Sequence, residues 1–371
     1  MTILFDINHP SYAHAFKHVI AQLKEKGHKI FVTATDKDIT HVLLKAYSIP
    51  FISTGRSPAG NRVKAVFRIF KKVFILLNII RKNRIELILS FESPYAVLAG
   101  WLCRKKTITC ADTEAATRIH KITGNLSSAI LVPSCFQKKL SLSQVSLKGF
   151  KELAYLHPAV FQPDKKIVSE NGLNPEEPYC IIRFVAFNAL HDKGYSGFSE
   201  KHKIKLVRTL SKNLKVYISS EGPLIKELQP YRTFLPPEKM HHALAFASLF
   251  IGESPTMAAE AAVLGVPSVC ATHMQLGYLE ELSETYGLLY KFDLSEAGQE
   301  MAVSKALSLA DDKNVIGDSK TKRKIMLEDS INVTEFLVWF IENYPGSYEK
   351  MNSPSPKASV NRGKPRLPGK F

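Results

Sequence analysis

The chain has 371 residues, too many for one ordinary hydrophobic core, so its length predicts about two domains. Hydrophobic residues make up 45% and charged residues 23%, a composition that excludes a chain disordered throughout its body. The formal net charge is +16, and the five cysteines are scattered without a CxxC pair or a Cys/His cluster, a pattern that disfavours a metal site and fits a reducing compartment.

The positive charge is concentrated in two segments. Nine basic residues and no acid lie between positions 55 and 85, and six basic residues with one acid lie from 347 to 371. We therefore expect the protein to contact an anionic surface, of lipid or nucleic acid, through one localised region. The opening residues MTILFDINHP lack a signal-peptide pattern, and no run of 18 apolar residues occurs in the sequence. We therefore expect a cytoplasmic protein, and the basic segments suggest the inner face of the membrane as a further location.

Strand and helix patterns alternate from the first residue. We expect strands at 2–7, 29–34, 87–90, 106–110 and 129–132, with helices at 12–26, around 39–46, at 62–84 and at 94–103. This alternation predicts an α/β half whose parallel sheet is covered on both faces.

A second series of the same kind follows a stretch that contains Pro158 and Pro163. We expect strands at 179–185, 215–219, 249–252 and 267–271, and helices at 200–213, 256–264 and 331–343. The predicted organisation is one half at 1–157, a linker at 158–164, a second half at 165–325, a returning helix within 326–345 and a disordered basic tail at 346–371.

The most specific segment is LFIGESPTMAAEAAVLGVPSV, residues 249–269. It predicts a strand, a tight turn at Gly252, and a helix with Ser254 as N-cap and Pro255 at its first position. Such a helix start presents free N–H groups that suit a phosphate, and Glu260, about a turn further on, can accept hydrogen bonds from ribose hydroxyls. Ordinary helix capping in an α/β protein is the alternative interpretation.

This segment resembles the donor-site signature of GT-B glycosyltransferases and of the non-hydrolysing UDP-N-acetylglucosamine 2-epimerases. The resemblance implies that Ser254, Pro255, Thr256 and Met257 lie at the diphosphate and Glu260 at the ribose. Glu253, Ser254 and Pro255 stand where those proteins have a glycine pair.

A closer resemblance covers most of residues 1–345. The stretches ILFDINHPSYAHAFK, ELAYLHPAVFQPD and GESPTMAAEAAVLGVPS are similar to an uncharacterised GT-B-like family of bacteria and archaea, the domain of unknown function three-five-four. It implies two Rossmann-like parallel-sheet domains facing a central cleft, with a C-terminal helix that returns to the first domain.

Asn8, His9 and His14 follow the first predicted strand, at the carboxyl end of a parallel sheet, where ligands bind. The resemblance implies that this loop faces the acceptor, with His14 or His9 as the general base that removes the acceptor proton. Alternatively, His9 shapes an Asn-His-Pro turn and His14 lies on the helix surface.

Glu92 and Asp112 follow two further strands of the first half and are expected to face the same cleft. By resemblance to the 2-epimerases these two acids, with His191, carry out proton transfer and sugar binding. Helix capping is the alternative for both acids. Arg183, at the end of the first strand of the second half, is expected to add positive charge near the donor phosphates, or else to pair with an acid.

The segment at 62–84, RVKAVFRIFKKVFILLNIIRKNR, is basic and apolar together. It predicts either a helix lying on an anionic membrane surface or a core-packed helix with a basic exposed edge, and exposed aromatic side chains decide between them.

These features together favour a glycosyltransferase that uses a nucleotide-sugar donor, UDP-linked in our expectation, with a glycan or lipid-linked acceptor and no cofactor or metal. Two alternatives remain open: a nucleotide-sugar 2-epimerase, and a non-catalytic basic protein on the same scaffold that binds membrane or nucleic acid. Nucleic acid is the less favoured partner, because the basic run lacks the spaced aromatics of a stacking platform.

Overall fold

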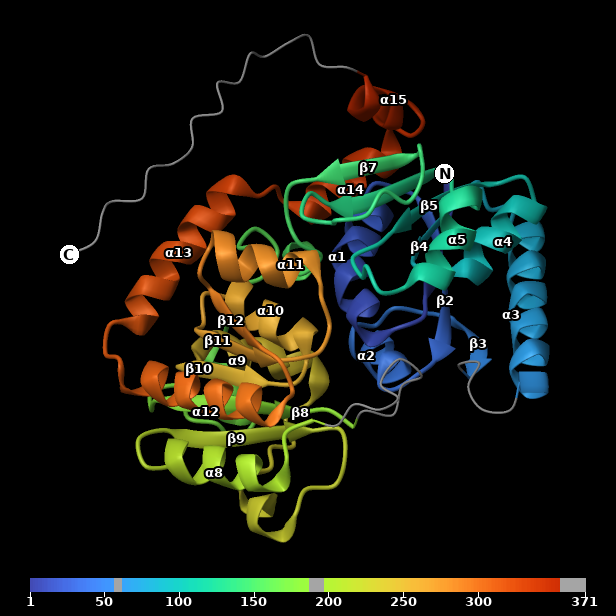
Figure 1. Cartoon of the computed structure of the whole chain (residues 1–371). Coiled ribbons are helices and arrows are strands. Elements are labelled where there is room, and N and C mark those ends of the chain that lie inside the picture. The colour runs from blue at the N-terminus through green and yellow to red at the C-terminus, as the bar shows by residue number, and fades with distance from the viewer. Residues whose placement is uncertain (57–61, 187–196, 354–371) are drawn as a thin grey trace.

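The structure is a computed structural model that describes residues 1–56, 62–186 and 197–353, with backbone alone at 62–66. Within these residues the chain forms two parallel β-sheets covered by helices, which stand side by side (Figure 1). The predicted α/β architecture of two Rossmann-like halves is confirmed.

The first sheet has seven strands in the order β3-β2-β1-β4-β5-β6-β7, and every neighbouring pair is parallel. Its central strands are continuous apolar runs because helices cover both faces. The strands are β1 Thr2–Ile7, β2 Lys29–Asp36, β3 Ile52–Arg56, β4 Leu87–Phe91, β5 Lys106–Cys110, β6 Ala129–Pro133 and β7 Gln144–Leu147.

Five helices connect these strands: α1 Pro10–Glu25, α2 Thr40–Ala46, α3 Arg62–Lys82, α4 Pro94–Leu102 and α5 Thr117–Leu126. Helix α1 begins two residues earlier than predicted, because Pro10 occupies its first position and His9 caps it. Gly27 follows its end with a φ of +83°, a conformation in which glycine is favoured.

The second sheet has five parallel strands in the order β12-β11-β10-β8-β9. They are β8 Tyr179–Phe184, β9 Lys215–Ser220, β10 Leu249–Gly252, β11 Ser268–Ala271 and β12 Leu289–Phe292. Helical turns that are not α-helical occur at Lys226–Tyr231, Pro237–Lys239 and Glu281–Thr285. The α-helices are α7 Lys165–Glu170, α8 Glu200–Leu210, α9 Met240–Phe246, α10 Pro255–Val263, α11 Gly277–Glu280, α12 Glu296–Asp311 and α13 Val315–Asp329.

The chain returns to the first domain at its end, as predicted. Helix α14, Val333–Glu342, packs beside α1 and the short α6, Leu153–Leu156. The Thr334 hydroxyl donates to the carbonyl of Ala154 at 2.6 Å, and Lys26 pairs with Glu342 at 2.6 Å.

The disordered tail was predicted to begin at residue 346, and this boundary is wrong. Residues 346–352 form a further helix, α15 Gly346–Asn352. The buried Ser347 hydroxyl donates to the carbonyl of Phe340 at 2.7 Å, which ties the start of α15 to α14. Residues 354–371 lie outside the described part of the chain.

Strands β3, β7 and β12 were not predicted, and each lies at the edge of its sheet. An edge strand is only partly covered, so its sequence need not be a continuous apolar run: β3 reads ISTGR and β7 reads QVSL. β9 is also an edge strand, but it was predicted, because its sequence KVYISS keeps an apolar centre.

Each sheet contains one point at which the strand order reverses. In the first sheet this point lies between β1 and β4, and in the second between β8 and β10. Ligands of open α/β sheets bind beyond the carboxyl ends of the strands at such points. None of the described helices is long and apolar enough to cross a membrane.

Candidate functional site

The loop after β1 lies at the reversal point of the first sheet. The Asn8 side-chain amide donates to the carbonyl of Phe91, at the end of β4, at 3.5 Å. His9 caps α1 by accepting the Ser11 N–H at Nδ1, at 3.3 Å. A neutral ring that accepts at Nδ1 carries its proton on Nε2.

His14 is buried in α1, so the alternative that placed it on the helix surface is wrong. Its Nδ1 lies 2.7 Å from the Tyr47 hydroxyl, and its ring stacks on Tyr155 with centroids 5.4 Å apart. The ring of His241, from the second domain, meets it edge-on at 4.6 Å. Burial, and then the neighbouring His241, hold the pKa of His14 well below its usual value, so the ring is neutral at neutral pH.

Glu92 follows β4 with a φ of +44°, an unfavourable conformation for a residue with a side chain. Its Oε1 accepts the Thr113 N–H and lies 3.2 Å from Nε2 of His120. Burial raises the pKa of Glu92, against the opposing effect of the His120 contact. Its other oxygen, Oε2, accepts no hydrogen bond from the described residues.

Asp112 follows β5 and forms a buried ion pair, with its Oδ2 2.6 Å from Nζ of Lys151. Lys151 also lies 3.5 Å from the Glu152 carboxylate. Burial opposes the charge of Lys151, but Asp112 and Glu152 outweigh it and the pKa of Lys151 is raised.

Neither Glu92 nor Asp112 caps a helix, which was the alternative interpretation of both. The Ser93 hydroxyl caps α4 by accepting the Ala96 N–H at 3.3 Å, and α5 begins only after Ala116. Both acids lie at the carboxyl edge of the first sheet, as expected.

The helix start predicted in the second domain is present at the end of β10. The Ser254 hydroxyl accepts the Met257 N–H at 3.4 Å, and Pro255 is the first residue of α10. Ser254, Pro255, Thr256 and Met257 are all half-buried. Gly252 is required beside β8, because a Cβ there would lie 2.6 Å from the carbonyl oxygen of Arg183.

Glu253 ties the turn after β10 to the chain after β8. Its carboxylate accepts the N–H of Val185 at 2.7 Å and of Phe198 at 2.5 Å. These two residues flank positions 187–196, which lie outside the described residues and include His191. Glu253, which stands in the position of a glycine in the donor-site signature, therefore holds the backbone that follows β8 at the reversal point of the second sheet.

Arg183 lies at the end of β8 and is paired with an acid, as its alternative interpretation proposed. Its guanidinium donates to the Ser219 hydroxyl at 2.7 Å and to the Glu221 carboxylate at 2.5 Å. Its Nε is buried and has no hydrogen-bond partner among the described residues.

Glu260 is buried in α10 and faces the first domain. Its Oε1 accepts the Tyr155 hydroxyl at 2.8 Å and lies 3.1 Å from Nε2 of His241. Burial disfavours its charge, but His241 and the hydrogen bonds outweigh it and the pKa of Glu260 is lowered. Both contacts fall on Oε1, and Oε2 accepts no hydrogen bond from the described residues.

The residues that sequence analysis missed are those that hold the predicted ones in place: Lys151, Tyr155 and His241. Tyr155 lies in ELAYLHPAVFQPD, a stretch quoted for the family resemblance, which was the available signal. Lys151 directly precedes this stretch, but nothing in the sequence singled out its side chain. Among the described residues, no group of three or more His, Cys, Asp or Glu side chains is arranged to hold a metal ion.

Comparison with known proteins shows which family the chain belongs to. Residues 1–334 match the family described as "Protein of unknown function (DUF354)". The chain belongs to this family. An uncharacterised protein of Methanocaldococcus jannaschii is 22% identical to this DUF354 protein over 309 residues, which cover 80% of this chain and 89% of the relative.

Solved structures resemble the DUF354 chain along most of its length. S. aureus MnaA in complex with UDP has a TM-score of 0.66 at 14% identity, covering 93% of this chain and 97% of that one. A UDP-N-acetylglucosamine 2-epimerase has a TM-score of 0.59 at 12% identity (92% and 96%), and spinosyn rhamnosyltransferase SpnG has 0.60 at 12% (92% and 100%). At such identities the likeness shows the fold, and the GT-B architecture is confirmed.

Proposed function

We propose that this DUF354 protein is a GT-B glycosyltransferase that moves a sugar from a nucleotide diphosphate, UDP in our proposal, to a glycan or lipid-linked acceptor. The observation that carries the proposal is the pairing, on helix α10, of a capped N-terminus with the carboxylate of Glu260 about a turn further in. The helix start suits the diphosphate, and Oε2 of Glu260, which accepts no hydrogen bond from the described residues, suits a ribose hydroxyl.

In this scheme the second domain stabilises the leaving diphosphate. The first turn of α10 offers the backbone N–H of Thr256 and the positive end of the helix dipole to the charge that develops there, since Pro255 has no N–H and the Met257 N–H is held by the Ser254 hydroxyl. The guanidinium of Arg183, at the neighbouring strand end, adds positive charge. Tyr155 and His241 act as positioning residues, since they hold Oε1 and leave Oε2 of Glu260 for the ribose.

The acceptor side belongs to the first domain, with Asn8 at the loop after β1. His9 is engaged at Nδ1 as the cap of α1, and the ring of His14 is enclosed by Tyr47, Tyr155 and His241. We therefore assign the general base to Glu92, whose pKa is raised by burial and whose Oε2 has no hydrogen bond from the described residues. A raised pKa strengthens a carboxylate as a base at neutral pH.

Thermal unfolding in the presence of nucleotides and nucleotide sugars tests the donor site. A bound ligand at 100 times its Kd stabilises the folded state by about 2.7 kcal/mol. We expect UDP and UDP-sugars to raise the Tm of the protein, and Glu260→Gln to weaken their binding at least tenfold. If Glu260→Gln binds every stabilising nucleotide as tightly as the parent, the ribose assignment is wrong.

Ser254→Ala separates the phosphate role from helix capping, with Asn332→Ala as its matched control. Both side chains cap a helix by accepting a backbone N–H, so each substitution is expected to cost about 1 kcal/mol of stability. Only Ser254→Ala is expected to reduce the Tm increase caused by UDP. An equal reduction in both variants would assign Ser254 to capping alone.

Epimerisation of a nucleotide sugar is the second candidate function, and the pair Glu92 and Asp112 favours it. Both carboxylates lie at one sheet edge, and burial, together with the neighbouring Asp112, raises the pKa of Glu92, which suits a group that removes and returns a proton. Proton removal from a sugar carbon exchanges solvent deuterium into the product, and simple transfer does not. Deuterium at the second carbon of a UDP-sugar incubated in heavy water, without acceptor, would favour the epimerase.

A further inference from the structure

Helix α3 has two faces of different character. Val73, Leu76 and Ile80 are buried in a cluster with residues of β1, β4 and α4. On the opposite side Phe67, Phe70 and Phe74 are exposed to 70%, 70% and 64%. Their spacing of three and four residues aligns the three rings in one stripe along the helix. The sequence analysis offered a core-packed helix or a membrane-surface helix for this segment. The first interpretation describes the buried face of α3, and the exposed aromatic face keeps the second one open.

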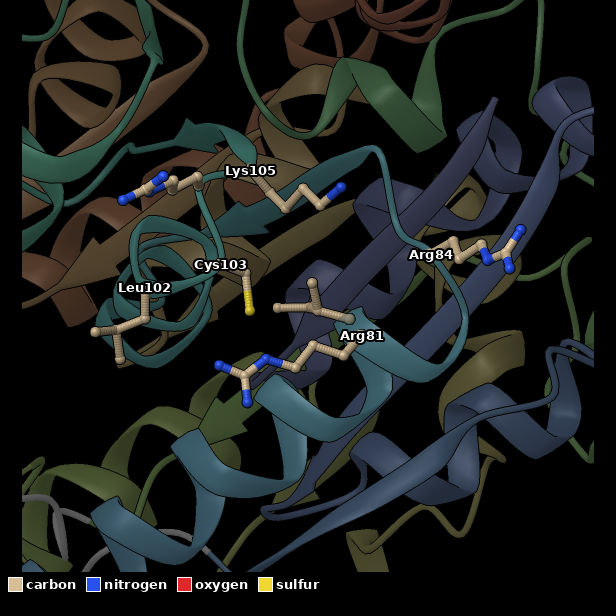
Figure 2. A pocket seen from close by; sticks show the side chains of 7 residues that line it. Arg81, Arg84, Leu102, Cys103 and Lys105 are labelled. Atoms are coloured by element: carbon tan, nitrogen blue, oxygen red, sulfur yellow. The ribbon is translucent and has the colours of Figure 1, made fainter.

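Basic side chains flank the aromatic stripe. Lys71, Arg81 and Lys82 are exposed on α3, and no acidic residue occurs in the sequence between 57 and 85. At the far end of the helix a surface hollow lies between the ends of α3 and α4 (Figure 2). The hollow is lined by four cationic side chains together with Ile80, Leu102 and Cys103; the four are Arg81, Arg84, Arg104 and Lys105.

This surface lies away from the interface between the domains. Helix α3 forms the outer edge of the first domain, on the side opposite the second domain (Figure 1). The hollow lies at the amino edge of the first sheet, because Arg84 lies shortly before β4 and Lys105 directly precedes β5. Helix α3 runs antiparallel to the strands, so the Phe67 end points toward the carboxyl edge, where the candidate site lies.

We propose that this α3–α4 face, comprising the aromatic stripe and the basic hollow, docks on the surface of an anionic lipid bilayer. The three rings enter the boundary between headgroups and acyl chains, and the flanking cations pair with lipid phosphates. Water-exposed rings in a row carry a free-energy penalty that an apolar phase removes. A nucleic acid duplex would match the cations and leave the rings in water, because its bases are already paired and stacked. A single strand could stack its bases on Phe67, Phe70 and Phe74, spaced aromatics that the sequence analysis did not expect, so it is the rival partner that the vesicle experiment must exclude. The docking is independent of the sugar transfer proposed above.

Sedimentation with lipid vesicles tests the docking with the full chain. We expect at least tenfold tighter binding to vesicles of phosphatidylcholine with 30% phosphatidylglycerol than to pure phosphatidylcholine, and weaker binding as salt rises. The double variants Phe70→Ser/Phe74→Ser and Lys71→Glu/Arg81→Glu are each expected to weaken anionic-vesicle binding at least tenfold. All four side chains are exposed, so the variants keep the core intact.

Matched controls lie on the second domain. Phe234 is 84% exposed, and Lys212 and Lys313 are exposed. Phe234→Ser therefore removes an exposed ring, and Lys212→Glu/Lys313→Glu reverses two exposed charges, at positions away from α3. Both controls are expected to bind within twofold of the parent. Equal parent binding to both vesicle types, or none at low salt, overturns the proposal. So does unchanged binding of the phenylalanine variant, which would leave a charge effect that a nucleic acid or the basic tail can equally explain.

Discussion

At the scale of single residues, Glu152 is a buried acid of the first domain whose surroundings favour its protonated form. Glu152 is 1% exposed, and burial raises its pKa to about 7, although Lys151 lies close by and opposes the shift. Its Oε1 has no hydrogen-bond partner among the described residues. The ordinary pKa of a glutamate in the unfolded chain is near 4.5, so the folded state binds a proton more tightly than the unfolded state.

This raised pKa predicts the sign of a pH effect on stability. The contribution of Glu152 is fully present below pH 4.5 and is lost as the pH rises toward 7, by at most about 1.4 kcal/mol per pH unit. Glu152→Gln cannot ionise, so its stability relative to the parent should rise across that window and level off above it. Urea unfolding from pH 5 to 8 measures this, with the exposed Glu284→Gln as a control that follows the parent. A parallel pH profile for Glu152→Gln and the parent would contradict the raised pKa.

At the scale of elements, α3 shows how one helix divides adjacent residues of the same type between two environments. Lys71 is exposed, whereas Lys72 is 2% exposed and donates to the Thr35 hydroxyl at 2.6 Å. The Lys72 ammonium also lies 3.8 Å from the carboxylate of Asp6, which is fully buried at the end of β1. Burial lowers the pKa of Lys72, and Asp6 opposes this.

Lys72→Met is therefore expected to destabilise the protein by about 3–5 kcal/mol, because it leaves Asp6 as a buried charge without its cation. Lys71→Met, one position away, should change the free energy of unfolding by less than about 0.5 kcal/mol. Urea unfolding of both variants at pH 7 provides the comparison. Equal effects at the two positions would show that the Lys72–Asp6 pair carries no such role.

At the scale of the whole molecule, two contacts bring the domains together at different points. The hydroxyl of Tyr155 reaches Glu260, and the backbone N–H of Gly277, at the start of α11, donates to the Glu114 carboxylate at 3.0 Å. A Cβ at Gly277 would lie 2.2 Å from the carbonyl oxygen of Cys135 and 2.7 Å from Glu114. No side chain fits there without moving the domains apart.

Gly277→Ala is therefore expected to destabilise the protein by about 1–3 kcal/mol and to weaken UDP binding, since the same separation withdraws Tyr155 from Glu260. Gly317→Ala is the control: this glycine lies in α13 with open space around it, and alanine is expected to add up to about 1 kcal/mol of helix stability. Unfolding and UDP titration measure both variants. Unaltered stability of Gly277→Ala would mean that the domain contact is adaptable.

The sequence alone determined the features that depend on near neighbours. The central strands are apolar runs, and α10 begins at Pro255 with Ser254 as its cap; both features were predicted because covered strands and helix caps are encoded within a few residues. The positions of Asn8, Glu92 and Asp112 at one edge followed from the same alternation, because parallel strands end together.

Only the tertiary structure decided what those side chains touch. Glu260 meets Tyr155 from 105 positions away, and Asp112 meets Lys151 from 39, so neither pairing has a period or spacing by which to recognise it. The tertiary structure also decides which side chains are buried. Lys71 and Lys72 are adjacent lysines, and the packing of α3 against the sheet exposes the first and buries the second. Local backbone preferences define the elements, whereas the charges and hydrogen bonds of the candidate site depend on how two domains lie against each other.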